Sequence, residues 1–411
     1  MLEKMFFSWI FLGFAISSIK ADCILPLPRF RFFNPLIFSS EGNLLKTDSF
    51  DEHDLSITVP VNKEVTLSCA PNYFKTPSLN DSKTLTATCK SGEIFEVDGV
   101  DKNWLLDLGC EVRPVEEVIK SIPGCPDEAT SVEFGYENPI KSKTQLIGEA
   151  CYSEKEGRTI FVHTKFIKNG NEKYAELDTE NVNYLAQKHP ESQYKINFLV
   201  ASRMDALNER LERQLSTKKV PFLAPRHFID LPIWQNGQLY STLKLGWNYA
   251  ISNGFDYLAN YDLILKDIMG FSELKNFDLY MGTHSKLSLK TKEEDVVDIY
   301  VLPNEQKYPV PKYLWIVVTT ESGKGAGFLI SNNIDAKPDD VAATAPCESK
   351  CAQMTWMSNL LNGNAYKNPT NGYVYCCEIN KLMRVVTEMP SLEGRYTLLA
   401  GRTTHRQFGD I

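Results

Sequence analysis

Ten cysteines constrain this chain more than any other sequence feature, and all ten follow an apolar N-terminal segment. Met5–Ile19 is apolar apart from three serines, Lys4 precedes it, and Ala21 stands at the expected cleavage position. This pattern predicts a signal peptide at residues 1–21, with a core too short for a membrane span. An even number of cysteines in an exported chain predicts disulfides and not metal thiolates. We therefore expect a secreted, extracellular protein that does not associate with membranes and is cross-linked at Cys23, Cys69, Cys89, Cys110, Cys125, Cys151, Cys347, Cys351, Cys376 and Cys377.

The spacing of the cysteines divides the chain into two parts. Four lie between positions 23 and 110 and two at 125 and 151, none lies from 152 to 346, and four lie between 347 and 377. A length of 411 residues fits two folded units. We expect a small cysteine-containing module at 22–115, a boundary at Pro114–Pro123 and a larger domain at 125–405. Because Cys376 and Cys377 are adjacent, they should pair with different partners, most simply Cys347 and Cys351.

The small module is predicted to be rich in β-structure. Ser56–Val59, Glu64–Cys69 and Thr84–Cys89 carry β-branched residues and are followed by turn residues. A module this small buries too little apolar surface to be stable through its core alone, so the disulfides should supply much of its stability. The order of its cysteines around Trp104 resembles a lengthened sushi-type module, from which no function is carried over. Asn80 begins an Asn-Asp-Ser acceptor and is predicted to be glycosylated.

The larger part alternates strands with two predicted helices. Apolar residues repeat at helical spacing at about 202–215, after a possible cap at Ser202, and again at about 256–269. Strands are expected at Asp278–Met281, Lys286–Leu289 and Asp298–Leu302, and a hairpin at Tyr313–Thr319 and Ala326–Ser331. Short strands with helices between them indicate an α+β fold and not a doubly wound parallel sheet.

The balance of charge excludes a strongly basic nucleic-acid coat. The chain has 44 Lys+Arg against 52 Asp+Glu, a formal charge of −8, but one stretch is locally basic. In one interpretation this stretch is a solvated helix with ion pairs such as Glu209–Arg213. In the other it is a phosphate-binding rim. Its basic residues are Arg203, Arg210, Arg213, Lys218, Lys219 and Arg226.

Five segments of the larger part resemble the DNA/RNA non-specific endonuclease family, in the secreted, cysteine-rich form found in arthropods. The segments are Val220–Pro225, Leu279–Thr283, Pro309–Trp315, Gly325–Asn333 and Gly372–Cys377. The resemblance implies a ββα-metal nuclease fold with a central antiparallel sheet. It also implies hydrolysis of DNA and RNA, with a histidine base, a Mg²⁺- or Mn²⁺-type ion held by asparagine, and an arginine on the phosphate.

This chain departs from the family at the reacting atoms. The family motif is Arg-Gly-His-Leu-Ala-Pro, and Val220, Pro221 and Phe222 stand at its arginine, glycine and histidine. Phenylalanine cannot accept a proton, so the general base is missing. Loss of a general base alone typically lowers a rate by about 10²–10⁴.

The metal motif of the family, Asn-x-Gly-x-Trp-x-x-Leu-Glu, is altered as well. Aligning Gly254 with its glycine places Ser252 at the metal-binding asparagine and Asn260 at the glutamate. Serine is a poor sole ligand for such an ion. A shift of one residue offers Asn253 as ligand and Asp262 as its acidic partner, and it requires an insertion near the start of the helix.

His227 is the candidate for a relocated base. It follows Phe222 by five residues, about 16 Å in an extended chain. The competing interpretations are a packing or surface residue and, together with Arg226, a phosphate contact in the inherited groove. His284 lies in a matched segment, but nothing in its spacing recommends it as a base, and the remaining histidines show no metal-ligand spacing.

The sequence therefore predicts a secreted nuclease-like protein that is catalytically impaired and retains at most binding of DNA or RNA, through Arg226, Lys218 and Lys219. The first alternative is an active Mg²⁺- or Mn²⁺-dependent endonuclease with a site built from Asn253, Asp262 and His227. The second is an extracellular structural or protein-interaction role.

Overall fold

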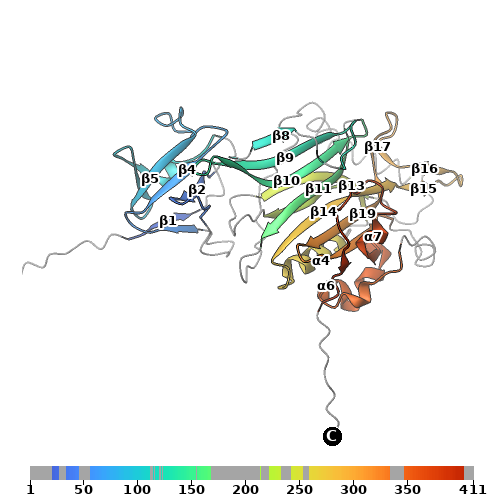
Figure 1. Cartoon of the computed structure of the whole chain (residues 1–411). Coiled ribbons are helices and arrows are strands. Elements are labelled where there is room, and N and C mark those ends of the chain that lie inside the picture. Colours follow the sequence, from blue (N-terminus) through green and yellow to red (C-terminus); the bar gives the residue numbers. More distant parts are fainter. Residues whose placement is uncertain are drawn as a thin grey trace, which may run out of the picture.

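The computed structural model is built mostly of strands, with a few short helices (Figure 1). It describes residues 21–26, 34–45, 56–111, 114, 116–119, 122, 124–153, 155–167, 213, 222–232, 242–252, 259–333 and 347–401. Of the predicted helix at 202–215, the structure describes only Arg213, which is helical. No helix in these described ranges is long and apolar enough to cross a membrane.

Residues 23–111 form two small antiparallel sheets. Their strands are β1 (Cys23–Pro26) with β3 (Ser56–Val59), and, in sheet order, β2 (Leu36–Ser39), β4 (Glu64–Ser68), β5 (Thr84–Ser91), β6 (Ile94–Val97) and β7 (Val100–Asn103). The three strands predicted here are confirmed, to within two residues at their ends. Helix α1 (Trp104–Asp107) follows, and its Trp104 lies in the same core.

Two interlaced disulfides run through this core. Cys23 pairs with Cys89 and Cys69 with Cys110, and all four are fully buried. They close loops of 66 and 41 residues in sequence separation, which restricts the unfolded chain strongly. Asn80 lies in an exposed turn of this region, where a glycan can be accommodated.

The next part of the chain forms a nine-stranded sheet that is antiparallel except at one edge pair. Its strands, in sheet order, are β8 (Glu116–Ile119), β9 (Thr130–Asn138), β10 (Lys143–Ser153), β11 (Arg158–Ile167), β14 (Asn276–Lys286), β19 (Pro311–Thr320), β20 (Lys324–Ser331) and β21 (Val374–Cys377). The ninth strand, β22 (Thr397–Leu398), pairs in parallel with β20. Strand β8 lies inside the stretch predicted as a boundary.

The first sheets contact the nine-stranded sheet through β2 and the loop after it. Phe38 packs against Tyr136 of β9, with ring centroids 6.2 Å apart. Asn138 donates a hydrogen bond of 2.8 Å from its side-chain amide to the carbonyl of Gly42. Leu36, Phe38 and Leu44 thereby join one hydrophobic cluster with the larger sheet.

Both faces of the nine-stranded sheet are covered. On β19, Leu314, Ile316 and Val318 face the cluster that contains α4 (Ala259–Gly270) and α6 (Ser358–Leu361). Trp315 and Val317 alternate with them and face the cluster that contains α7 (Ile379–Leu382). Burial on both faces explains why this strand is an unbroken apolar run.

The side chains of the two adjacent cysteines in β21 also point to opposite faces of the sheet. Cys376 faces the first cluster and pairs with Cys351, and Cys377 faces the second and pairs with Cys347. The two disulfides therefore tie the segment around 347–351 to opposite sides of one strand. The prediction that these four cysteines pair with one another is confirmed, and with Cys125–Cys151 all ten cysteines form disulfides.

The predicted apolar helix is confirmed where the structure describes it. Helix α4 buries Tyr261, Ile264, Leu265 and Ile268, four of the predicted stripe residues. The predicted hairpin at Ser322–Gly325 is confirmed as the β19–β20 turn. Trp315 is completely buried, as expected for a core residue.

Two predicted strands are each divided between two elements. Residues 286–289 pass from β14 into β15 (Ser288–Lys290), and 298–302 pass from β16 (Val296–Asp298) into β17 (Tyr300–Leu302), which pairs with β18 (Lys307–Pro309). At the breaks, Ile299 donates its backbone N–H to Leu287 and Leu287 donates to Val310. These cross-links between segments set the strand ends, and no local pattern encodes them.

The remaining elements are a hairpin and three short 3₁₀ turns. The hairpin is formed by β12 (Phe222–Pro232) and β13 (Thr242–Ser252). The turns are η1 (Cys351–Gln353), η2 (Asn362–Lys367) and η3 (Pro369–Asn371).

Asp267 of α4 caps α6 and should be a strong determinant of stability. Its buried carboxylate accepts hydrogen bonds from the backbone N–H groups of Asn359 and Leu360, at 3.0 and 2.9 Å. We expect Asp267→Ala to lower the free energy of unfolding by about 2 kcal/mol, because the cap and its buried partners are lost together. Guanidinium unfolding with the disulfides intact measures this. The exposed neighbour Lys266→Ala is the control, and equal effects of the two variants would contradict the capping role.

Candidate functional site

The hairpin β12–β13 brings together two positions at which the chain departs from the endonuclease motifs. Phe222, at the position of the base, is the Cα partner of Ser252, at the position of the metal ligand. These residues lie 30 positions apart in sequence and belong to separate motifs. A nuclease of this kind needs its base and its metal close together, and the pairing places the two positions opposite each other.

Asn260, at the position of the supporting glutamate, lies in the core of the protein. It is completely buried on α4, and its side-chain amide donates to the carbonyls of Ala365 and Gly372 at 2.8 and 2.7 Å. Its Oδ1 atom has no hydrogen-bond partner in the described part of the chain. These contacts attach α4 to η2 and to the loop before β21, which is a structural role.

The residues described at these positions do not fit a hydrated divalent ion. Phe222 offers no ligand atom, Ser252 offers one neutral oxygen, and Asn260 supplies no charge, whereas Mg²⁺ sites normally use carboxylates. Across the described ranges, no group of three or more His, Cys, Asp or Glu side chains could hold a metal ion.

The other predicted site residues are only partly brought together. Arg226 and His227 lie in β12, opposite Asn248 and Trp247. Phe222 and His227 belong to one continuous strand, so the extended spacing of about 16 Å applies. Asp262 is exposed in the first turn of α4. Val220, Lys218, Lys219 and Asn253 lie outside the described residues.

His163 sits between two carboxylates on one face of the large sheet. Its Nδ1 is 3.0 Å from Glu149 and its Nε2 is 3.0 Å from Asp278, and its ring stacks on Tyr280 at 4.2 Å. Burial lowers the pKa of the imidazole, but hydrogen bonds and charge from Asp278 and Glu149 outweigh it and raise the pKa above 6.5. Both ring nitrogens are engaged, so the group is an ionic cross-link of β10, β11 and β14.

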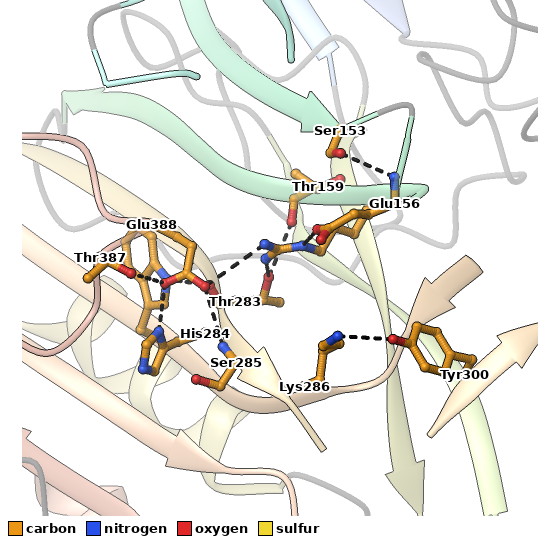
Figure 2. A network of polar contacts seen from close by, with 12 residues as sticks. Ser153, Glu156, Thr159, Thr283, His284, Ser285, Lys286, Tyr300, Thr387 and Glu388 are labelled. Atoms are coloured by element: carbon orange, nitrogen blue, oxygen red, sulfur yellow. Dashed lines mark hydrogen bonds and ion pairs between the residues drawn. The ribbon is translucent and has the colours of Figure 1, made fainter. Parts of the chain in front are cut away.

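His284 belongs to a second polar cluster, at the end of β14. Figure 2 shows Glu388 at its centre, with contacts to His284, Ser285 and Thr387. The carboxylate is 2.6 Å from Nδ1 of His284, 3.1 Å from the Thr387 hydroxyl and 3.9 Å from the guanidinium of Arg158. Burial opposes ionisation of Glu388, but His284 and Arg158 outweigh it and lower the pKa of the carboxyl to about 2. The carboxylate is therefore charged throughout the physiological range.

No sequence pattern predicted this second cluster. His284 and Glu388 lie 104 positions apart, and Arg158 reaches them from the neighbouring strand β11. Neither Glu388 nor Arg158 stands in a recognisable motif: Arg158 meets His284 through the pairing of β11 with β14, and Glu388 comes from the segment after α7.

No protein-family model matches the chain. The chain is similar to a salivary protein. It is 25% identical over 410 residues to the salivary protein Tsal1 of Glossina morsitans morsitans, a match that covers 91% of this chain and 93% of that relative. Similarity to a salivary protein and five disulfides are both consistent with the predicted secretion.

The raised pKa of His163 predicts how stability depends on pH. Because the folded state binds this proton more tightly than the unfolded state, the stabilisation is complete below pH 6.5 and is lost as pH rises through the folded pKa. The free energy of unfolding of the wild type should therefore exceed that of His163→Gln by more at pH 5.5 than at pH 9. Guanidinium titrations at both pH values measure the difference. A gap that is independent of pH would show that the ionic cross-link contributes nothing.

Proposed function

We propose that this protein is a secreted, salivary-type protein that binds nucleic acid on a DNA/RNA non-specific endonuclease scaffold and has lost metal-dependent hydrolysis. The observation that carries the proposal is the register of β12 and β13, in which Phe222 lies opposite Ser252. Two motifs matched separately in sequence thus meet where that family needs its base and its metal ligand.

The remaining matched segments also support the proposal. The other matched segments form β14, β19, β20 and β21, which are neighbours in one antiparallel sheet. Helix α4, which begins at the end of the altered metal motif, packs on that sheet through its apolar face. The similarity to a salivary protein along almost the whole chain favours secretion.

Loss of hydrolysis follows from the chemistry of the replaced side chains. Phe222 cannot take a proton from water, and Asn260 is committed to two backbone carbonyls. Binding makes fewer demands, because phosphates are held by cations without any proton transfer. Arg226 lies in the same strand as Phe222, four residues along it, and is the cation that we propose holds a phosphate.

Binding of nucleic acid in EDTA tests this proposal. We expect fluorescence anisotropy of a labelled duplex to show binding that weakens at least about tenfold between 50 and 200 mM NaCl. Arg226→Ala should weaken binding and reduce the logarithmic salt slope by about one, since one phosphate contact is lost. Arg395→Ala, which removes an exposed arginine elsewhere, is the control.

The competing functions give different results in the same experiment. A structural or protein-interaction role predicts no binding at any salt concentration. An active enzyme with a site built from Asn253, Asp262 and His227 predicts cleavage of the duplex once EDTA is replaced by Mg²⁺ or Mn²⁺. Either result would overturn the proposal.

A further inference from the structure

His284 and Glu388 form a pair with the geometry of a general base and its orienting carboxylate. A carboxylate is an acceptor only, so the Nδ1 atom of neutral His284 must carry the proton that it shares with Glu388 at 2.6 Å. The lone pair is then on Nε2. If Nε2 takes up a proton, the fixed negative charge of Glu388 stabilises the imidazolium.

The Nε2 atom of His284 is open to solvent. It has no hydrogen bond to any described residue, and the fully buried polar side-chain atoms without a partner in those ranges are Tyr136 Oη and Asn260 Oδ1. The His284 side chain keeps 15% of its surface exposed. His163 is the contrast, because both of its nitrogens are blocked.

The surroundings hold the pair in one orientation. Glu388 is fixed by the Thr387 hydroxyl, by the backbone N–H of Ser285 at 3.5 Å and by Arg158, which itself bonds to Glu156 and Thr283. Ser285 has a φ of 57°, a conformation that a non-glycine residue adopts at a cost, and its N–H points at the carboxylate. Strain retained beside a histidine–carboxylate pair is characteristic of functional sites.

Two lysines lie close to His284 in the sheet, Lys286 on the same strand and Lys312 next to the strand partner Tyr313. Lys286 follows two residues after His284 at the end of β14 and is 48% exposed; its ammonium lies 3.0 Å from the hydroxyl of Tyr300 (Figure 2) and 3.5 Å from the carboxylate of Asp298. The Tyr313 ring stacks on His284 at 6.2 Å, and the ammonium of Lys312 lies 5.3 Å from that ring. Exposed ammonium groups attract phosphate, so the surface around the pair suits the backbone of a nucleic acid.

We propose that His284, oriented by Glu388, cleaves RNA without a metal ion, at a site distinct from the β12–β13 hairpin. RNA carries its own nucleophile next to each phosphate, so a general base is the main requirement. Nε2 takes the proton of the 2′-hydroxyl, the 2′ oxygen attacks phosphorus, and the P–O5′ bond breaks. The products are a 2′,3′-cyclic phosphate and a 5′ oxygen, which takes a proton from water, while the imidazolium returns its proton to solvent. DNA lacks the 2′-hydroxyl and is not cut.

This inference rests on the proposed binding of nucleic acid, and the test separates the two. A labelled single-stranded RNA and the DNA of the same sequence are incubated in EDTA with wild type, His284→Asn and His163→Asn. We expect the wild type and His163→Asn to cut RNA at equal rates, to leave cyclic phosphate ends and to spare DNA. His284→Asn keeps a donor toward Glu388 but lacks the base, so its rate should fall by at least about 100-fold.

The positioning role of Glu388 requires a separate readout. Glu388→Gln should lower the rate less than His284→Asn and should shift the ascending limb of the pH–rate profile to lower pH, because a neutral partner no longer stabilises the imidazolium. An unchanged pH profile would refute this role for Glu388.

Each outcome has one meaning. RNA that binds by anisotropy but is not cut by the wild type overturns this inference and leaves the proposed function intact. RNA that is neither bound nor cut overturns both. Equal cutting by wild type, His284→Asn and the second variant His284→Gln also overturns the inference, since a contaminating ribonuclease would give that result.

Discussion

The burial of β19 on both faces is the constraint on which the larger part of the structure depends. Leu314, Ile316 and Val318 require cover on one side and Trp315 and Val317 on the other, so helices must lie on both faces of the sheet. Helices α4 and α6 supply one cover, and α7 with the segment that follows it supplies the other. The disulfides of Cys376 and Cys377 anchor both sides to the same strand.

The covering segments also carry the polar contacts that give the molecule its chemistry. The segment after α7 brings Glu388 to His284 at the end of β14. On the other face, α4 places Asn260 among backbone carbonyls. The same packing that stabilises the sheet therefore also positions the Asn260 contacts and the His284–Glu388 pair. Accordingly, the proposed binding function and the proposed RNA cleavage belong to different parts of the fold.

Local sequence patterns correctly predicted the elements that depend on residues close together in the sequence. Strand β3, the β19–β20 hairpin and the buried stripe of α4 follow from alternation, turn residues and helical spacing. Because Cys376 and Cys377 are adjacent, the sequence already predicted that they pair with different cysteines, as they do. Contacts between segments far apart in the sequence could not be predicted. One example is the hydrogen bond between Asn260 and Gly372, 112 positions apart. Another is the set of backbone hydrogen bonds between segments at the ends of β14 and β16. His284 was set aside because its spacing carried no signal, and its partner Glu388 comes from the segment after α7, 104 positions away.

The central claim is that the inherited metal-dependent site no longer cuts nucleic acid. Incubation of the mature protein with supercoiled plasmid DNA in Mg²⁺ or Mn²⁺, with an EDTA control and Phe222→His alongside, tests it most directly. The proposed RNA-cleaving pair cannot contribute, because DNA lacks the 2′-hydroxyl. We predict that the wild type leaves the plasmid supercoiled in every condition. Nicking that depends on the metal and disappears in EDTA would contradict the claim and would direct mutagenesis to Asn253, Asp262 and His227.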